Sequence, residues 1–255
     1  MLTYDVAVPR ATITLDDPDR RNPMSIEVMQ AILERLREAI AAPDVKVIVI
    51  TGAGDRAFSA GGDLSGGFVD EPVALHRARG VLADIFRTMR TGGKPTVARV
   101  NGHALAGGFG LAAACDIVIA VDRAKFGMPE INVGLWPMMI GAVLQRAMPH
   151  KAALELMMTG RLISAGEAQR LGVVSRVVAA EALDEAVDEM VSDLASKSPL
   201  ILELGRDAFY AVEDMAFDAA LDHLQVGLTE VALTEDAAEG VAAFLEKRRP
   251  EWRGR

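Results

Sequence analysis

The sequence predicts an α/β protein built around a parallel β-sheet. Three short runs of mostly β-branched and apolar residues have the character of buried strands: Val45 to Thr51, Pro95 to Val100 and Ile117 to Val121. Glycine-rich sequence follows the first two runs, and a segment with helical periodicity follows each of those loops. A repeated order of strand, loop and helix is typical of βαβ units, whose strands pair in parallel.

The segment before the first buried strand predicts a hairpin and one helix. Tyr4 to Val8 and Ala11 to Leu15 alternate partly in polarity on either side of Pro9-Arg10, as in an edge hairpin. Ser25 can cap a helix that runs to about Ala41, because apolar residues recur on one stripe of that segment. The stripe consists of Ile26, Met29, Leu33, Leu36 and Ile40.

Further along the chain, helical patterns dominate. Between the buried strands, helices are expected at about residues 72–90 and 108–114. Ser164 can cap a short helix that ends at Gly172, before a short strand near Val173 to Val178. The chain then has amphipathic segments at about 181–197, 200–212, 215–230 and 237–248. We therefore expect a core of residues 1–180 and a helical region of residues 181–255 that fold as one unit.

The composition argues against several classes of protein. The 255 residues include 36 acidic and 27 basic ones, and a net charge of −9 is the opposite of what general nucleic-acid binding requires. The four histidines and one cysteine are scattered, with no metal-ligand spacing. Cys115 ends an apolar run and is expected to be buried filler rather than a nucleophile. With one cysteine, no signal peptide and no apolar run of membrane-spanning length, the chain is expected to be cytoplasmic, with no membrane partner.

Two glycine-rich turns follow buried strands, at residues 56–64 and 101–110. Glycine lets another molecule approach the main chain closely, and turns after parallel strands lie at the sheet edge where α/β proteins bind ligands. The second turn opens a helix, so free N–H groups near Gly107 and Gly108 meet the positive end of the helix dipole. One N–H from each turn could converge on a single oxygen as an oxyanion hole. The alternative is that both turns are merely tight connections.

A dinucleotide-binding fingerprint is a competing interpretation of the first turn. Gly52 to Ala57 matches its glycine spacing directly after a strand. The fingerprint requires a helix that opens at once to hold a pyrophosphate, whereas residues 58–67 remain glycine-rich. We therefore reject this interpretation.

A single carboxylate, Glu130, lies in the otherwise apolar segment from Phe126 to Pro137. Burial in such surroundings would raise its pKa and make it usable as both base and acid. The alternative is an exposed loop glutamate with no chemical role.

In this order and spacing, the two turns and the glutamate resemble the crotonase family, also called the enoyl-CoA hydratase/isomerase family. The resemblance covers nearly the whole chain, from the Asp17 to Met24 turn to Phe244–Arg248, and includes Cys115 to Ile117, Thr159 to Ala165 and Ala168 to Val174. It implies the crotonase (ClpP-like) fold, in which repeated ββα units form a spiral core and a helical C-terminal region mediates trimerisation.

The resemblance also implies a function in acyl-CoA and fatty acid metabolism. The backbone N–H groups of Ala60 and Gly107 would stabilise a thioester enolate while Glu130 moves a proton. Coenzyme A would be part of the substrate, with no permanently bound cofactor. It would meet Arg56, Ala57, Phe58, Gly61, Asp63 and Leu64, together with Phe244 and Lys247 of the C-terminal helices, often from a neighbouring subunit. The assembly implied is a homotrimer, or a hexamer made of two trimers.

The sequence departs from the family pattern at Gly110, where hydratases commonly have a second glutamate. Hydration needs an activated water and a proton for the α-carbon, whereas double-bond isomerisation needs one proton shuttle. The residues therefore favour an isomerase, although hydratases are the commoner members of the family. Gly108, Gly110, Trp136 and Met138 are the expected acyl pocket, with core packing as the alternative for the two bulky side chains.

Three functions are thus compared. The first is an enoyl-CoA hydratase and/or isomerase that uses one glutamate. The second is another crotonase-type reaction on an acyl-CoA: a dehydratase, decarboxylase, thioesterase or C–C hydrolase. The third is a catalytically weak CoA-binding homologue. For His103, beside the second turn, packing is favoured over a contact with substrate.

Overall fold

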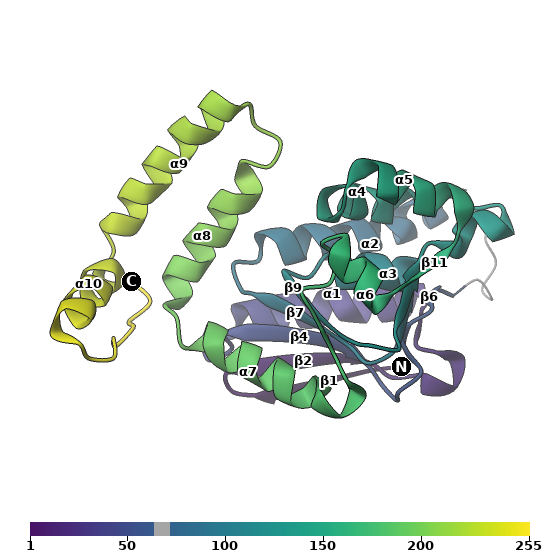
Figure 1. The fold of residues 1–255 in the computed structure, drawn as a ribbon, viewed down its shortest axis with the longest axis horizontal. Helices are drawn as coiled ribbons and strands as arrows, with labels where there is room; N and C mark the ends of the chain where they lie inside the picture. Colours follow the sequence, from purple (N-terminus) through teal and green to yellow (C-terminus); the bar gives the residue numbers. More distant parts are fainter. Residues whose placement is uncertain (64–71) are drawn as a thin grey trace.

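The computed structural model of the protein, which describes residues 1–63 and 72–255, has a six-stranded sheet at its centre (Figure 1). The strand order is β1-β2-β4-β7-β9-β12, and only the β1–β2 pair is antiparallel. Every residue of β4 is buried, so both faces of the sheet are covered. The strands are β1 (Leu2–Ala7), β2 (Arg10–Leu15), β4 (Val47–Gly52), β7 (Thr96–Val100), β9 (Ile117–Val121) and β12 (Arg176–Val178).

Short strands follow the long ones and form a second sheet, in the order β11-β10-β8-β5. Along the chain β5 follows β4, β8 follows β7 and β10 follows β9, and each pair leads into an α-helix: α2 after the short β6, α3 directly, and α4 after η2. This repeated order is the ββα unit of the expected spiral core, and the predicted fold class is confirmed. The remaining strands are β5 (Ala57–Ser59), β8 (His103–Leu105), β10 (Lys125–Gly127) and β11 (Leu162–Ser164), and the parallel pair β3 (Pro23–Met24) and β6 (Gly61–Gly62).

The predicted helices are present, and two begin at the predicted caps. Ser25 Oγ accepts the N–H of Val28, and Ser164 Oγ accepts the N–H of Glu167. The α-helices are α1 (Ile26–Ala41), α2 (Pro72–Thr91), α3 (Gly107–Ala113), α4 (Met138–Ala147), α5 (His150–Thr159), α6 (Ala165–Arg170), α7 (Leu183–Ala195), α8 (Pro199–Ala211), α9 (Phe217–Ala232) and α10 (Glu235–Glu246). The 3₁₀ helices among the described residues are η1 (Pro18–Arg20), η2 (Pro129–Val133) and η3 (Ala180–Ala182).

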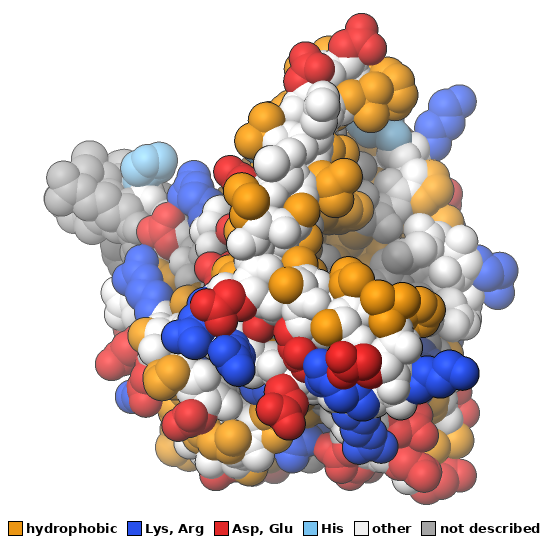
Figure 2. All heavy atoms as spheres, turned by 90° about the vertical axis from the view of Figure 1, so that its left-hand side faces the viewer, with side chains coloured by type: hydrophobic (Ala, Val, Ile, Leu, Met, Phe, Trp, Pro, Cys, Tyr) orange, Lys and Arg blue, Asp and Glu red, His pale blue; other side chains and the backbone are white. Residues whose placement is uncertain are grey.

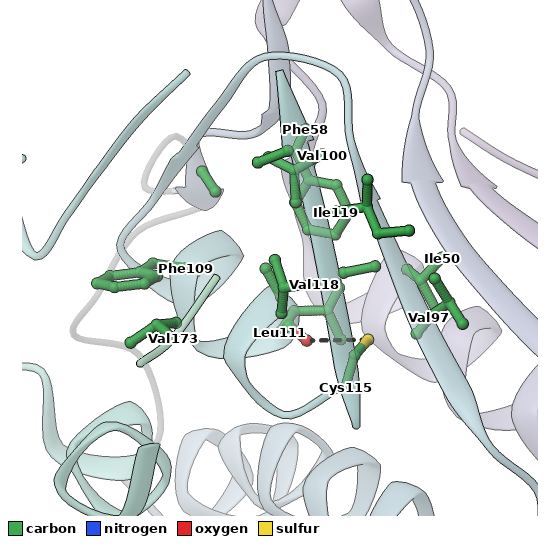
Figure 3. Packing of buried hydrophobic residues seen from close by; sticks show 14 of the residues in the cluster. Ile50, Phe58, Val97, Val100, Phe109, Leu111, Cys115, Val118, Ile119 and Val173 are labelled. Carbon is green, nitrogen blue, oxygen red and sulfur yellow. Dashed lines mark hydrogen bonds between the residues drawn. The ribbon is translucent and has the colours of Figure 1, made fainter. Parts of the chain in front are cut away.

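The core packs the central strands against aromatic side chains from the turns and α3 (Figure 3). Phe58, Phe109 and Phe126 are fully buried, and the rings of Phe109 and Phe126 lie 5.4 Å apart. Cys115 is buried in the same cluster, where its Sγ donates to the Leu111 carbonyl at 3.6 Å, and burial raises the pKa of the thiol. The prediction that Cys115 is core filler is confirmed.

One carboxylate, Asp116, joins the C-terminal helices to the core. Its Oδ1 accepts hydrogen bonds from Arg206 Nη2 at 2.9 Å and Tyr210 Oη at 2.6 Å, both on α8. Its Oδ2 accepts from the N–H and Oγ1 of Thr96, at the start of β7, each at 2.7 Å. Asp116 and Arg206 are both mostly buried, so replacing either one would leave the other as an unpaired buried charge.

The helices after residue 180 differ in how far their side chains are buried. α7 belongs to the core, since Leu183, Val187 and Val191 lie in the main hydrophobic cluster. In contrast, α9 contains no buried residue, and α8 to α10 project away from the sheet (Figure 1). The division at residues 180 and 181 stays a prediction about folding units. In the part of the chain that the structure describes, no helix is both long and apolar enough to cross a membrane.

Candidate active site

The first glycine-rich turn is held by the buried side chain of Asn22. Its Nδ2 donates to the carbonyl oxygens of Ala57 at 2.8 Å and Ala53 at 3.0 Å. In return, Ser59 Oγ donates to the Asn22 carbonyl at 2.8 Å and accepts the N–H of Gly61 at 3.1 Å. Asn22 is 1% exposed and has a left-handed backbone with φ of 55°, a conformation that asparagine tolerates better than most residues. The turn is therefore fixed before any ligand binds.

The second turn presents unpaired N–H groups at the start of α3. Ala106 has φ of 50°, its N–H donates to the Gly127 carbonyl at 2.9 Å, and its own carbonyl accepts from Phe109 and Gly110. Within the described residues, the N–H groups of Gly107 and Gly108 donate to no backbone oxygen. These are the free donors that a helix start leaves, and an electron-rich oxygen could accept from them.

The two turns touch each other through their main chains. A Cβ on Gly61 would lie 2.6 Å from the Ala106 Cβ and 3.1 Å from the Gly107 nitrogen. A Cβ on Gly108 would lie 2.6 Å from both the Cβ and the carbonyl oxygen of Ser59. Real side chains do not come so close, so only glycine fits at both positions. The sequence-based expectation that the turns meet is therefore supported by their geometry.

The amide of Ala60, one of the two expected oxyanion donors, has a partner in this structure. It donates to the carbonyl oxygen of Arg21 at 2.9 Å. Arg21 has φ of 66° and immediately precedes Asn22, so the left-handed turn that supports the first loop also supplies this acceptor. A thioester oxygen would have to share or displace this bond at Ala60. The role of Ala60 stays a prediction.

Glu130 lies in η2, directly after β10, the strand that pairs with the second turn. Three residues before it, Gly127 is hydrogen-bonded to Ala106 and paired in parallel with Leu105. The Oε2 atom of Glu130 is buried and has no hydrogen-bond partner among the described residues. Burial raises the pKa of its carboxyl, although a bond from its own backbone N–H partly offsets this. A carboxylate oxygen without a donor is suited to accept a proton from a bound molecule.

The residues expected to meet coenzyme A are spread over two regions. Arg56 is exposed and Asp63 pairs with Arg20 at 2.7 Å, but the side chains of Ala57 and Phe58 are buried, so that only their main chain could face a ligand. Leu64 lies outside the described residues.

The C-terminal pair of expected coenzyme A contacts, Phe244 and Lys247, lies at the end of α10. Both residues are exposed, and α10 lies on the far side of the molecule from α3 (Figure 1). Within one chain they therefore do not approach the two turns. This placement is compatible with contacts to a neighbouring subunit, which stay a prediction.

The expected acyl-pocket residues differ in exposure. Gly108 and Gly110 are buried, whereas Trp136 is 38% exposed and Met138 is 74% exposed. The alternative of core packing for these two side chains is therefore wrong, because both lie at the surface just before and at the start of α4. The Nδ1 of His103 accepts the N–H of Lys125 at 3.1 Å, so this histidine joins two strands of the second sheet.

No metal centre competes with this site in the part of the chain that the structure covers, because no group of three or more potential ligand side chains was found there. The described residues thus offer main-chain donors and one unpaired carboxylate to a bound molecule.

Comparisons with known proteins agree with this geometry. A family model described as Enoyl-CoA hydratase/isomerase matches residues 9–255. A Thermus thermophilus relative, whose name also refers to an enoyl-CoA hydratase, is 38% identical over 248 residues, covering 95% of this chain and 96% of the relative. A carnitinyl-CoA dehydratase of Salmonella typhi is 34% identical over 252 residues, covering 97% and 96%. The crystal structure of an enoyl-CoA hydratase from Mycobacterium smegmatis superimposes with a TM-score of 0.94 at 33% identity, covering 98% of both chains.

Replacing Glu130 by glutamine is expected to stabilise the protein by a few degrees in melting temperature at about pH 8. Folding raises the pKa of this carboxyl above 4.5, so the charged form is disfavoured in the folded state. The gain of Glu130→Gln over wild type is complete above the raised pKa. It disappears as the pH falls to 4.5 and below, where the carboxyl is neutral in both states. Thermal melts across this range measure the difference, and a variant that melts below wild type at pH 8 would contradict a desolvated Glu130.

Proposed function

Because the chain belongs to the enoyl-CoA hydratase/isomerase family, also called the crotonase family, we propose that it moves a proton on an enoyl-CoA with Glu130 as its single proton carrier. The reaction is double-bond isomerisation, hydration or both. The observation that carries this proposal is the unpaired, buried Oε2 of Glu130 together with two main-chain turns in contact.

The main chain supplies the electrostatic part of the mechanism. The N–H of Gly107, at the start of α3, donates to no other described group and would hold a thioester oxygen as it gains negative charge. The Ala60 amide would be the second donor once its bond to the Arg21 carbonyl is shared or exchanged. An aligned donor of this kind typically lowers the barrier by about 3–4 kcal/mol.

Glu130 supplies the proton transfer. As a base it would take a proton from C2 of the acyl group, and the electron pair would delocalise onto the thioester oxygen held by the amides. Because burial raises the pKa of the Glu130 carboxyl, the protonated form is stabilised and can hold the proton until it is returned to carbon. Coenzyme A enters as part of the substrate, and no step requires another cofactor.

Water elimination from a 3-hydroxyacyl-CoA is a second candidate reaction. It is supported by the Salmonella typhi relative, which is named for a dehydration and is 34% identical to this chain. The same enolate and the same glutamate would serve, so dehydration of a 3-hydroxyacyl-CoA should depend on Glu130 as the other two reactions do.

We also propose that the protein assembles as a homotrimer or as two stacked trimers. α9 has no buried residue and carries exposed apolar side chains, and hydrophobic atoms spread over the faces of the C-terminal helices (Figure 2). An apolar surface of this extent on a helix pair is suited to contact between subunits. The exposed apolar residues include Phe217, Leu221, Leu224, Leu228, Val241, Phe244 and Leu245.

Sedimentation velocity tests the assembly. A species of three or six times the chain mass of 27.2 kDa is expected at micromolar concentration. A stable monomer at that concentration would contradict the proposal and would leave the apolar face of α9 without an explanation.

Replacing Glu130 by glutamine tests the proposed chemistry. Isomerisation of 3-enoyl-CoA, hydration of crotonyl-CoA and dehydration of 3-hydroxybutyryl-CoA should each fall by about 10²–10⁴-fold, because the amide cannot carry the proton. Binding of a saturated acyl-CoA, measured by calorimetry, should persist. The matched control is Glu34→Gln, since Glu34 is an exposed glutamate on α1, and its turnover should equal that of wild type. Activity that survives Glu130→Gln would remove this residue from the mechanism.

A further inference from the structure

Gly110 occupies a chemically important place on α3. It lies three residues after Gly107, so a side chain there would project from the same face of the helix, one turn beyond the free amide. Helical side chains lean toward the N-terminus, so a protic side chain at this position would reach back toward the Gly107 amide and could act as a second proton carrier for a molecule held there. Gly110 is buried, and no side chain is present to do this.

The space that a side chain at position 110 would need is occupied. A Cβ there would lie 2.3 Å from Ile140 Cγ2, 2.7 Å from Ile140 Cβ and 3.3 Å from Phe86 Cζ. Ile140 is 3% exposed on α4, and its Cβ is fixed by the backbone and cannot rotate away. The backbone of Gly110 is not left-handed, so glycine is required here for space and not for conformation.

We propose that Ile140 is a specificity-determining residue that fills the position of a second proton carrier and so favours isomerisation over hydration. The inference rests on the proposed function, because it concerns the choice between two reactions at the same site. The Ile140 and Phe86 side chains form an apolar wall with neither a donor nor an acceptor to orient a water molecule.

The two reactions differ in whether they need a water molecule beside this wall. In isomerisation of a 3-enoyl-CoA, Glu130 takes a proton from C2, the double bond moves from C3–C4 to C2–C3, and the same proton is returned to C4. No water is needed. In hydration of a 2-enoyl-CoA, the oxygen of water bonds to C3, one proton of that water goes to a base, and C2 gains a proton. Two proton transfers at different atoms then depend on one carboxylate.

A thermal double-mutant cycle tests whether Ile140 occupies the position. Gly→Ala within a helix ordinarily stabilises, but Gly110→Ala should lower the melting temperature by about 4–10 °C, because the added methyl overlaps Ile140. In an Ile140→Gly background the same change should be neutral or stabilising. Ile140→Gly is used because alanine would keep the Cβ that lies 2.7 Å away. An equal loss in both backgrounds, or a gain from Gly110→Ala alone, would overturn the inference.

An activity series tests the consequence for the reaction. The ratio of crotonyl-CoA hydration to 3-enoyl-CoA isomerisation is measured for wild type, Gly110→Glu, Ile140→Gly and the double variant. The double variant should raise this ratio by about 10²-fold or more, and neither single variant should do so. Ile140→Gly is the matched control, since it opens the space without adding an acid. A folded double variant with an unchanged ratio would overturn the inference.

Two outcomes separate this inference from the proposed function. If wild type hydrates as fast as it isomerises, the role of Ile140 is overturned while the proposed function stands. If wild type turns over no enoyl-CoA, the proposed function and the specificity role both fall, while the thermal cycle still decides whether Ile140 excludes a side chain at position 110.

Discussion

The site depends on the contact between two turns that approach each other closely where each has a glycine. At Gly61 and Gly108 a single methyl group would overlap the opposite turn at 2.6 Å. This contact brings the amide-rich start of α3 against the loop that Asn22 fixes through buried hydrogen bonds. Rigid donors cost little reorganisation when charge develops on a ligand oxygen, which is why such an arrangement can supply the largest part of a catalytic effect. The fold serves this contact, because each turn follows one strand of the parallel sheet and starts one strand of the second sheet.

Around that contact, the described side chains offer few polar groups to a bound molecule. Among the described residues, one buried oxygen of Glu130 has no hydrogen-bond partner, and Ile140 and Phe86 exclude a side chain at position 110, one helical turn beyond the Gly107 amide. In the proposed mechanism two main-chain donors and one carboxylate form an enolate and return the proton, and the apolar Ile140 and Phe86 side chains cannot direct water. The Arg21 carbonyl adds a further constraint, since it already accepts the Ala60 amide. In the proposed complex, a thioester oxygen would therefore exchange one hydrogen bond for another at the Ala60 amide, whereas the Gly107 amide would gain a new one.

The sequence was sufficient to predict the long elements and the two glycine-rich turns. The runs that form β4, β7 and β9 are continuous and β-branched, and Ser25 and Ser164 mark helix starts with a local signal. Strands such as β5 and β10, with three residues each, are too short to show a period and exist only because a neighbour pairs with them. The contacts of Asn22 and Ile140 could not be predicted, because both depend on tertiary structure. Asn22 bonds to residues more than 30 positions away, and Ile140 packs against Gly110 from a different helix. The exposure of Trp136 and Met138 escaped prediction for the same reason, since apolar residues before a helix are equally compatible with burial.

The most direct test of the account is exchange of the C2 protons of butyryl-CoA in deuterium oxide, followed by proton NMR. This saturated thioester has no double bond to move or hydrate, so exchange reports only the formation of an enolate by a base beside the donors. The account predicts that wild-type protein incorporates deuterium at C2 well above the buffer rate and leaves C3 and C4 unlabelled. Exchange no faster than in buffer, from a preparation that binds butyryl-CoA, would show that the turns and Glu130 do not together stabilise an enolate.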